Sequence, residues 1–404
     1  MAVAGVIDDR RSAGLTLALC FLAVLCEGLD IQSMGLAAPR MGPALGLARE
    51  QLGPLFSASI AGLLFGAVIF GRVADRFGRK WTLVVCLAVF GVFSLATAAV
   101  RPFGVLLAVR LIAGLGLGGA LPNLVALAAE AVAPESRAGL VTRITCGLPF
   151  GGAMCGVVAA NLDWRAIFYV GGWAPLALAP LAAFALPESR AFLETRDAAP
   201  TMTPARGDFR WILFGGGRAG ATLLLWTASF ASLLALYVLL NWLPTLLGDR
   251  GLAKTDASLV SMLFNIGAGV GVLILADLLD RRRRRRTIGL WYLGLAASLV
   301  ALAVANSGFL ATAAAGFAVG FFVSSVPLPL YGMAPCYYAV SMRGAGVGAS
   351  VAVGRLGAIF GPLLAASLLS VGAGASGVLL ALLPISAVAG CATIALIDRP
   401  RLAD

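Results

Sequence analysis

Long apolar stretches without charge are the feature of this sequence that most restricts its fold. Residues 287–342 contain no Asp, Glu, Lys or Arg, and hydrophobic residues make up 60% of the 404-residue chain. Charged residues make up 12%, against roughly 25% in an average soluble domain. A soluble fold of this composition would expose large apolar patches and aggregate. The composition therefore excludes a soluble enzyme, a disordered chain and a disulfide-bonded secreted module, and it predicts an integral membrane protein.

The apolar stretches predict twelve membrane-spanning helices. A span of the hydrocarbon core needs about 20 helical residues, and the alternating pattern of a membrane barrel is absent. The predicted spans are 15–38, 52–71, 81–100, 103–128, 144–160, 166–186, 219–247, 257–276, 287–305, 308–333, 345–370 and 376–397. We expect breaks at residues 306–308 and 372–377, where Asn, Ser and Gly interrupt long apolar runs.

The two halves of the sequence resemble each other at a shift of about 205 residues. Asp75-Arg76 aligns with Asp280-Arg281, and Pro39 aligns with Pro244, each proline being expected to end a span. Two parallel repeats of six helices place a substrate site near mid-membrane. We therefore predict an all-α membrane protein with an N-terminal six-helix bundle at 1–187, a cytoplasmic linker at 188–215 and a C-terminal six-helix bundle at 216–404.

The basic residues predict which loops face the cytoplasm. With the N-terminus inside, the cytoplasmic segments hold 22 Lys and Arg, and the opposite side holds 6. Such a bias is typical of membrane proteins with positive cytoplasmic loops. Both termini are therefore predicted to be cytoplasmic. The run Arg281–Arg286 is better explained as an anchor to anionic lipid than as a nucleic-acid site.

The sequence indicates no metal or cofactor. Histidine is absent, and the seven cysteines lie mostly in apolar runs without CxxC spacing. There is no nucleotide-binding motif that would drive an ATP-dependent pump, and no arrangement of a nucleophile and a base. We expect neither a cofactor nor enzymatic activity.

Several motifs resemble those of the major facilitator superfamily. GRVADRFGRK at 71–80 is similar to its loop signature, and Arg110 with the glycines at 114, 116 and 118 is similar to its fourth-helix signature. Within that superfamily, residues 26–37, 120–130, 241–244 and 342–362 resemble the aromatic acid:proton symporters, most of all the 3-(3-hydroxyphenyl)propionate permeases. Two departures are Glu27, where many relatives have Asp, and the poly-Arg loop.

The resemblance implies a function. It implies proton-coupled uptake of an aromatic carboxylate, such as 3-(3-hydroxyphenyl)propionate or a hydroxybenzoate, across a bacterial inner membrane. The expected partners are this small acid, protons and membrane lipid, with no nucleic acid, and we expect a monomer.

Four charged residues lie within the predicted spans: Glu27, Asp30, Arg110 and Arg355. Each costs about 2.5–3.5 kcal/mol or more at the bilayer centre unless it is compensated. Glu27 and Asp30 share one helical face, and Asp30 and Arg110 lie at a similar depth. Burial raises a carboxyl pKa and a nearby Arg lowers it, so either acid is a candidate proton carrier. The alternative is a static Asp30–Arg110 pair that joins two helices.

The candidate substrate-binding residues lie mainly in the second half. Arg355 falls near mid-membrane, and a substrate carboxylate could form a bidentate contact with its guanidinium. The alternative is that Arg355 bonds backbone carbonyls. In the seventh span a stripe of four residues could stack on a ring and bond its hydroxyl, although such stripes also serve in packing. The full set is Arg355, Arg110, Trp226, Phe230, Tyr237 and Asn241.

Charges in the cytoplasmic loops are candidate gate residues. Asp75 and Arg79 are predicted to pair with Arg137 and Glu130 in one conformation only. The candidate gate residues are Asp75, Arg76, Arg79, Glu130, Arg137 and Arg343.

Two other functions remain open. One is efflux of drugs or metabolites by proton exchange. Exporters of the superfamily usually carry a Gly- and Pro-containing signature in the fifth span, and residues 147–152 are related to it, but their Gly and Pro residues are displaced relative to the signature. The other is a non-transporting receptor, which would not need paired acids within the membrane.

Overall fold

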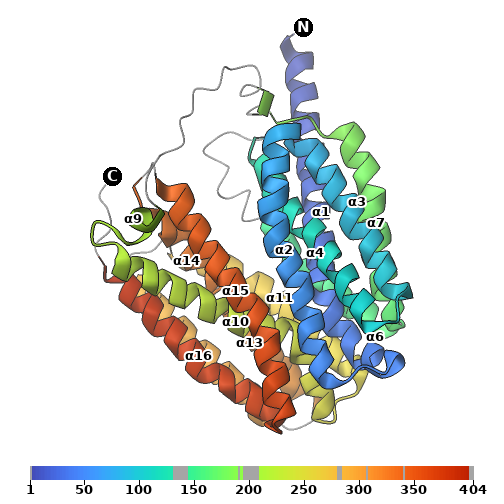
Figure 1. Ribbon diagram of the computed structural model, residues 1–404, viewed down its shortest axis with the longest axis vertical. Coiled ribbons are helices and arrows are strands. Elements are labelled where there is room, and N and C mark those ends of the chain that lie inside the picture. Colours follow the sequence, from blue (N-terminus) through green and yellow to red (C-terminus); the bar gives the residue numbers. More distant parts are fainter. Residues whose placement is uncertain are drawn as a thin grey trace. The chain divides into compact units, whose positions relative to one another are not determined.

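The computed structural model describes residues 2–130, 144–189, 192–193, 209–279, 284–305, 308–339 and 342–399. Within these ranges the chain is helical and contains no strand (Figure 1). Ten of its helices are long and apolar enough to cross a membrane, and two shorter apolar helices, Gly147–Asn161 and Phe309–Val323, bring the total to twelve. The predicted all-α membrane fold is confirmed.

The helices follow the predicted order. Those of the first half are α1 (Ala2–Leu45), α2 (Arg49–Phe77), α3 (Arg79–Ala99), α4 (Phe103–Glu130), α6 (Gly147–Asn161) and α7 (Trp164–Ala185). Those of the second half are α10 (Ala219–Asp249), α11 (Lys254–Leu279), α12 (Arg284–Val304), α13 (Phe309–Val323), α15 (Arg343–Ser370) and α16 (Gly374–Ile397). Short helices are α9 (Phe209–Phe214), α14 (Pro327–Met333) and the 3₁₀ turn η2 (Ala334–Tyr337).

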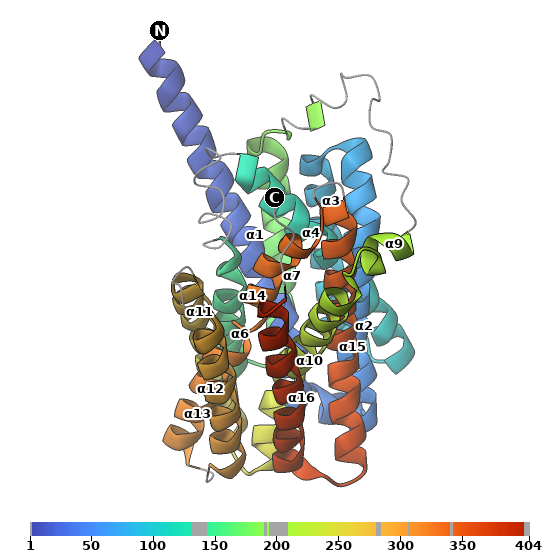
Figure 2. The ribbon, with the colours of Figure 1, turned by 90° about the vertical axis from the view of Figure 1, so that its left-hand side faces the viewer.

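The chain forms two compact units. Unit 1 comprises Met1–Leu45 and Ala58–Thr201, and unit 2 comprises Gly46–Ser57 and Met202–Asp404. In unit 1, α3 packs against α4 and α7, and α1 packs against α6. In unit 2, α10 packs against α15 and α16, while α11, α12 and α13 lie side by side (Figure 2). The first turns of α2 group with unit 2, where Ser57 Oγ donates to the Ile359 carbonyl at 2.7 Å.

The prolines predicted to end the first and seventh spans do not end them. Helix α1 contains Pro39 and continues to Leu45, and α10 contains Pro244 and continues to Asp249. Proline removes one backbone hydrogen bond and disfavours a helix interior. In membrane helices, however, neighbouring helices and side chains satisfy the freed groups, so the helix can pass through.

The two predicted breaks fall between helices. Helix α12 ends before residues 306–308 and α13 begins after them, although residues 306 and 307 lie outside the described part of the chain. The last two helices are joined through Gly372 and Gly374, whose φ angles are 82° and 67°. These angles favour glycine and allow a tight turn.

The predicted tenth span is interrupted. Helix α13 ends at Val323, and α14 begins at Pro327 after a short connection. Proline suits the first position of a helix, because its missing N–H has no partner there in any case. The interruption places Tyr331 on a separate short helix.

Glycines allow helix pairs to pack in close contact in both units. A methyl group added at Gly66 of α2 would collide with a carbonyl of α4, and one at Gly118 of α4 with a carbonyl of α2. In unit 2 the same relation holds for Gly271 of α11 and Gly320 of α13. Gly66 and Gly271 are 205 residues apart, the shift of the internal repeat. Because lipid supplies no hydrophobic force between helices, close packing of this kind is what associates them.

We expect Gly118→Ala to destabilise the protein, because the added methyl group meets the Leu63 carbonyl oxygen. The expected loss is about 1–3 kcal/mol, as for other overpacked interiors. Gly104→Ala, on the same helix with open space around it, is the matched control and should be neutral or stabilising. Thermal unfolding of both variants in detergent measures the difference. Equal midpoints would show that this crossing tolerates separation.

Candidate functional site

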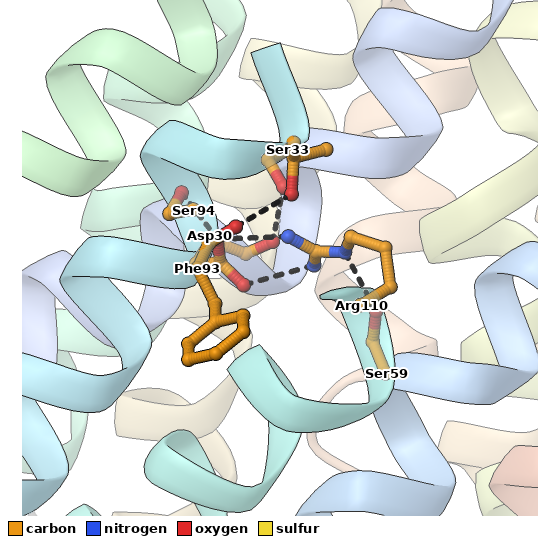
Figure 3. Close-up of polar contacts among 7 residues, drawn as sticks. Asp30, Ser33, Ser59, Phe93, Ser94 and Arg110 are labelled. Atoms are coloured by element: carbon orange, nitrogen blue, oxygen red, sulfur yellow. Dashed lines mark hydrogen bonds and ion pairs between the residues drawn. The ribbon is translucent and has the colours of Figure 1, made fainter. Parts of the chain in front are cut away.

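A buried ion pair joins α1 to α4 at the centre of unit 1 (Figure 3). Arg110 Nη1 donates to Asp30 Oδ1 at 3.2 Å, and Arg110 Nη2 donates to Asp30 Oδ2 at 3.0 Å. The Arg110 and Asp30 side chains are 1% and 0% exposed. The arrangement is therefore bidentate and closed to solvent, the geometry in which a guanidinium binds a carboxylate most strongly.

Three further helices support the pair. Ser94 of α3 donates its hydroxyl to Asp30 Oδ1 at 3.1 Å, and Arg110 Nε donates to Ser59 Oγ of α2 at 2.9 Å (Figure 3). The Arg110 guanidinium also lies over the ring of Phe168 on α7, 5.8 Å from its centroid. The charges are thus surrounded by hydrogen-bond partners and an aromatic face, which a buried pair needs to offset its desolvation.

The sequence predicted that Asp30 and Arg110 lie at the same depth in the membrane, and in the structure the two side chains form an ion pair. The assignment of Asp30 as a proton carrier and that of Arg110 as a substrate ligand both stay predictions. Glu27 lies one turn earlier on α1 and is 2% exposed, so the second candidate proton carrier is also inside unit 1. Within the described residues, no group of His, Cys, Asp or Glu side chains is suited to hold a metal ion.

In unit 2, Arg355 lies near the middle of α15 and contacts α10. Its Nη1 donates to the Tyr237 hydroxyl at 3.0 Å. Tyr331 of α14 lies close enough to interact electrostatically with both side chains and is 41% exposed. Asn241 is turned to its own helix, where its Nδ2 donates to the Tyr237 carbonyl at 2.9 Å. Arg355, Tyr237 and Tyr331 therefore form one group, which we call the Arg355 cluster.

Sequence reasoning missed Tyr331. The residue stands in an uncharged apolar stretch, where tyrosine reads as a packing residue. The available signal was the pair of prolines at 327 and 329, which end one helix and begin another. Interrupted membrane helices often border binding sites, since irregular backbone is tolerated where it lines a cavity.

The four residues of the stripe predicted along the seventh span have different neighbours, and their role in substrate binding stays a prediction. Trp226 packs edge-on against Phe214 with ring centroids 5.7 Å apart, and Phe230 packs against Phe360 at 6.3 Å. Arg355 instead bonds to Tyr237, two to three turns further along the same helix as these two rings. Trp226 and Tyr237 share an angular position but lie about 16 Å apart along the helix axis. Over that length a helix passes different neighbours, so residues on one face reach different environments.

One predicted gate pair is present. Arg79 Nη1 lies 2.7 Å from Glu130 Oε1, and Ser189 Oγ also donates to that oxygen at 2.9 Å. Glu188, which the sequence analysis did not single out, accepts the backbone N–H of Lys80 at 3.0 Å. A carboxylate at the start of α3 is stabilised by the helix dipole and by the unsatisfied N–H groups there.

The other gate candidates differ in their surroundings. Asp75 and Arg76 are exposed near the end of α2, and Asp75 makes no ion pair within the described ranges. Arg343 Nε donates to the Tyr338 carbonyl at 3.3 Å. Arg137 lies outside the described residues, so its predicted pairing with Asp75 is not addressed. A gating role for any of these residues stays a prediction.

Twelve apolar helices in two units, with charged groups held inside the helical bundles, define a multi-pass membrane protein. The chain belongs to the Major Facilitator Superfamily, whose family model matches residues 20–253 and 225–403.

Several of its curated relatives are transporters of small aromatic acids rather than enzymes. The 3-(3-hydroxy-phenyl)propionate transporter of Escherichia coli is 45% identical, over 95% of this chain and 94% of the relative. The gallate transporter of Pseudomonas putida is 37% identical over 91% and 89%, and the 4-hydroxybenzoate transporter PcaK of Pseudomonas aeruginosa is 35% identical over 93% and 90%. The resemblance found in the sequence is therefore confirmed.

Solved structures share the fold. The nucleoside transporter NupG matches with a TM-score of 0.76 at 15% identity, covering 96% of this chain and 100% of that one. The xylose transporter XylE from E. coli, in an inward open conformation, matches with a TM-score of 0.76 at 16% identity, covering 95% and 96%. At this identity the likeness shows the fold alone.

We expect Arg110→Met to destabilise the protein by about 3–5 kcal/mol, because it leaves the Asp30 carboxylate buried without its guanidinium. The double variant Asp30→Leu/Arg110→Met should recover most of the loss, since apolar side chains can replace a buried pair at little cost. Denaturant unfolding in detergent provides the comparison. A double variant no more stable than Arg110→Met would contradict this account of the pair.

Proposed function

We propose that this protein carries an aromatic carboxylic acid into the cell together with protons, by alternating access from the two sides of the membrane. The observation that carries the proposal is the contact between Arg355 and the Tyr237 hydroxyl near the middle of α15. The molecules named for the curated relatives support it, because each joins an aromatic ring to a carboxylate and at least one phenolic hydroxyl.

The Arg355 cluster has groups that match the parts of such a substrate. The planar guanidinium can bind a carboxylate through two parallel hydrogen bonds. The Tyr237 hydroxyl fixes the orientation of that guanidinium through a 3.0 Å contact. The half-exposed ring of Tyr331 offers a face for an aromatic ring to stack on. We therefore assign Arg355 to the carboxylate, with Tyr237 and Tyr331 as its neighbours in the site.

Proton coupling follows from the energetics of an anion. A monoanion that enters a cell with a negative interior works against about 2.3 kcal/mol per 100 mV. One proton carried with it cancels the charge, and a second would add the membrane potential as a driving force. We assign the proton site to Asp30, with Glu27 as a second acid. Protonation of Asp30 would weaken its two bonds to Arg110 and so alter the contact between α1 and α4.

We place the protein in a bacterial plasma membrane as a monomer, with both termini in the cytoplasm. The bias of 22 basic residues against 6 supports this orientation. Transport assays in proteoliposomes distinguish uptake from efflux, the alternative direction.

For the substrate site, we expect Arg355→Lys to weaken the binding of aromatic carboxylates by at least about tenfold. Lysine keeps the positive charge but loses the planar fork. The matched ligands are 4-hydroxybenzoate and its uncharged amide, measured by calorimetry in detergent at fixed pH with both proteins. The amide, which binds the native protein poorly, should lose little further affinity.

Tyr331→Phe is a second variant for the same site. It keeps the aromatic face and should bind the acid nearly as well as the native protein. If Arg355→Lys weakens acid and amide equally, Arg355 supports the fold rather than the carboxylate.

For the proton site, we expect Asp30→Asn to abolish accumulation of substrate driven by a proton gradient in proteoliposomes. Exchange of labelled for unlabelled substrate at equal pH should persist, because exchange needs no net proton release. This retained exchange is the control for folding. Accumulation at the native rate would remove Asp30 from the coupling mechanism, and loss of both activities would assign it a structural role.

The direction of transport is read from the same vesicles. Uptake predicts that substrate accumulates on the alkaline side of the membrane, whereas proton-exchange efflux predicts accumulation on the acidic side.

A further inference from the structure

An apolar groove lies on unit 2 between α15 and α16. Both helices pack closely along α10 and only weakly against each other, and Figure 1 shows α10 between them. The groove has a volume of about 530 Å³, within the range of roughly 300–1,000 Å³ common for small-molecule sites. Its floor includes Leu223, Trp226 and Phe230 of α10, and its α16 wall includes Pro384 and Val388.

The groove suits a hydrocarbon chain. Leu223 is 53% exposed and Val388 is 51% exposed, so the apolar lining is open rather than covered by the protein. The helices that form it are long and apolar enough to span a membrane, so acyl chains are available to an open groove of this kind. A groove of this kind can hold one acyl chain in place, whereas a flat helix surface would let the chain exchange with bulk lipid.

Two arginines lie near the start of α10, beyond the apolar lining of the groove. The guanidinium of Arg399 lies over Gly220, one turn from Leu223, since a methyl group added at Gly220 would meet its three terminal atoms at 3.0–3.1 Å. Arg218 precedes α10 and lies over the ring of Trp211, 4.9 Å from its centroid, and it donates to the Ile212 and Trp211 carbonyls at 3.2 and 3.0 Å. The nearby acid Asp398 is 3.1 Å from Arg285, which offsets its charge.

Helix α9 marks this end as a membrane–water boundary. Phe209 and Trp211 are 57% and 52% exposed, as expected of aromatic side chains at the headgroup level. Phe214, at the other end of α9, packs against Trp226, which lines the groove. The aromatic helix, the two arginines and the groove are therefore continuous.

We propose that this groove binds one anionic phospholipid, with its phosphate at Arg218 and Arg399 and one acyl chain between α15 and α16. Basic pockets between membrane helices at the charged surface of a membrane are suited to anionic headgroups. A substrate acid is a poorer fit, because the positive groups lie beyond the lining of the groove, which is apolar. The proposal is independent of the assignment of the substrate site.

The test is native mass spectrometry of the full-length protein in detergent, titrated with phosphatidylglycerol or phosphatidylcholine. We expect one phosphatidylglycerol adduct that binds about 30-fold more tightly than phosphatidylcholine, as two surface arginines would provide. Arg218→Gln/Arg399→Gln should abolish this preference. Val388→Phe, which fills the groove, should weaken binding of both lipids at this site.

Matched controls use exposed positions of unit 1. Val92 is 50% exposed on α3, so Val92→Phe controls for an added ring on a lipid-facing helix, and Arg72→Gln controls for a lost surface charge. Both controls should bind phosphatidylglycerol as the native protein does. Inorganic phosphate should not displace the lipid, which separates a lipid site from a phosphate site.

Three outcomes would overturn the proposal. They are equal affinity for the two lipids, native binding by the groove variants, and displacement of the adduct by 4-hydroxybenzoate. The last result would instead assign the groove, with Trp226 and Phe230, to the substrate. Thermal unfolding of each variant without added lipid confirms that lost binding does not come from lost structure.

Discussion

The hydrocarbon interior of a bilayer offers no hydrogen bonds, and this constraint explains the arrangement of the backbone and of the buried Asp30–Arg110 pair. The backbone satisfies itself within helices. Polar side chains must satisfy one another, and the Asp30–Arg110 pair does so with Ser94 and Ser59 in contacts of 2.9–3.2 Å. One acid on α1 thereby connects the helices α2, α3 and α4. Protonation of that acid would change contacts throughout the bundle, which is why we place the coupling proton there.

The two units share their packing but differ in their chemistry. Gly66 and Gly271 allow the same close helix crossings one repeat apart, so the internal repeat extends to the contacts between helices. The polar residues do not repeat. Unit 1 holds an acid and a base that neutralise each other, whereas unit 2 holds the Arg355 cluster, in which the arginine bonds to the Tyr237 hydroxyl. This difference supports our proposal that unit 1 carries the proton and unit 2 binds the anion.

Much of the candidate site could be predicted wherever depth and charge alone decide the arrangement. Asp30 and Arg110 are costly in a membrane and lie at one level, so their pairing follows from the sequence. Arg79 begins α3 and Glu130 ends α4, and the two side chains form their predicted pair at 2.7 Å. Tyr331 and Glu188 could not be found this way, because one depends on a break in a helix and the other on the return of the chain beside α3. The neighbours of Trp226 also could not be predicted, because helical periodicity gives the face on which it lies but not the Phe214 ring that packs against it.

The sequence by itself determined that the chain is an integral membrane protein, and it determined the twelve helices, the internal repeat and the family. Each of these features depends on local composition or on the spacing of residues along one chain. The tertiary structure decided which helices run through their prolines, which tyrosines stand beside Arg355, and where α15 and α16 separate to form the groove. These features depend on how neighbouring helices satisfy a freed carbonyl or how far they diverge along α10. The partners of these groups and the separation of these helices depend on contacts between segments that are distant in sequence. The periodicity of a single helix does not predict them.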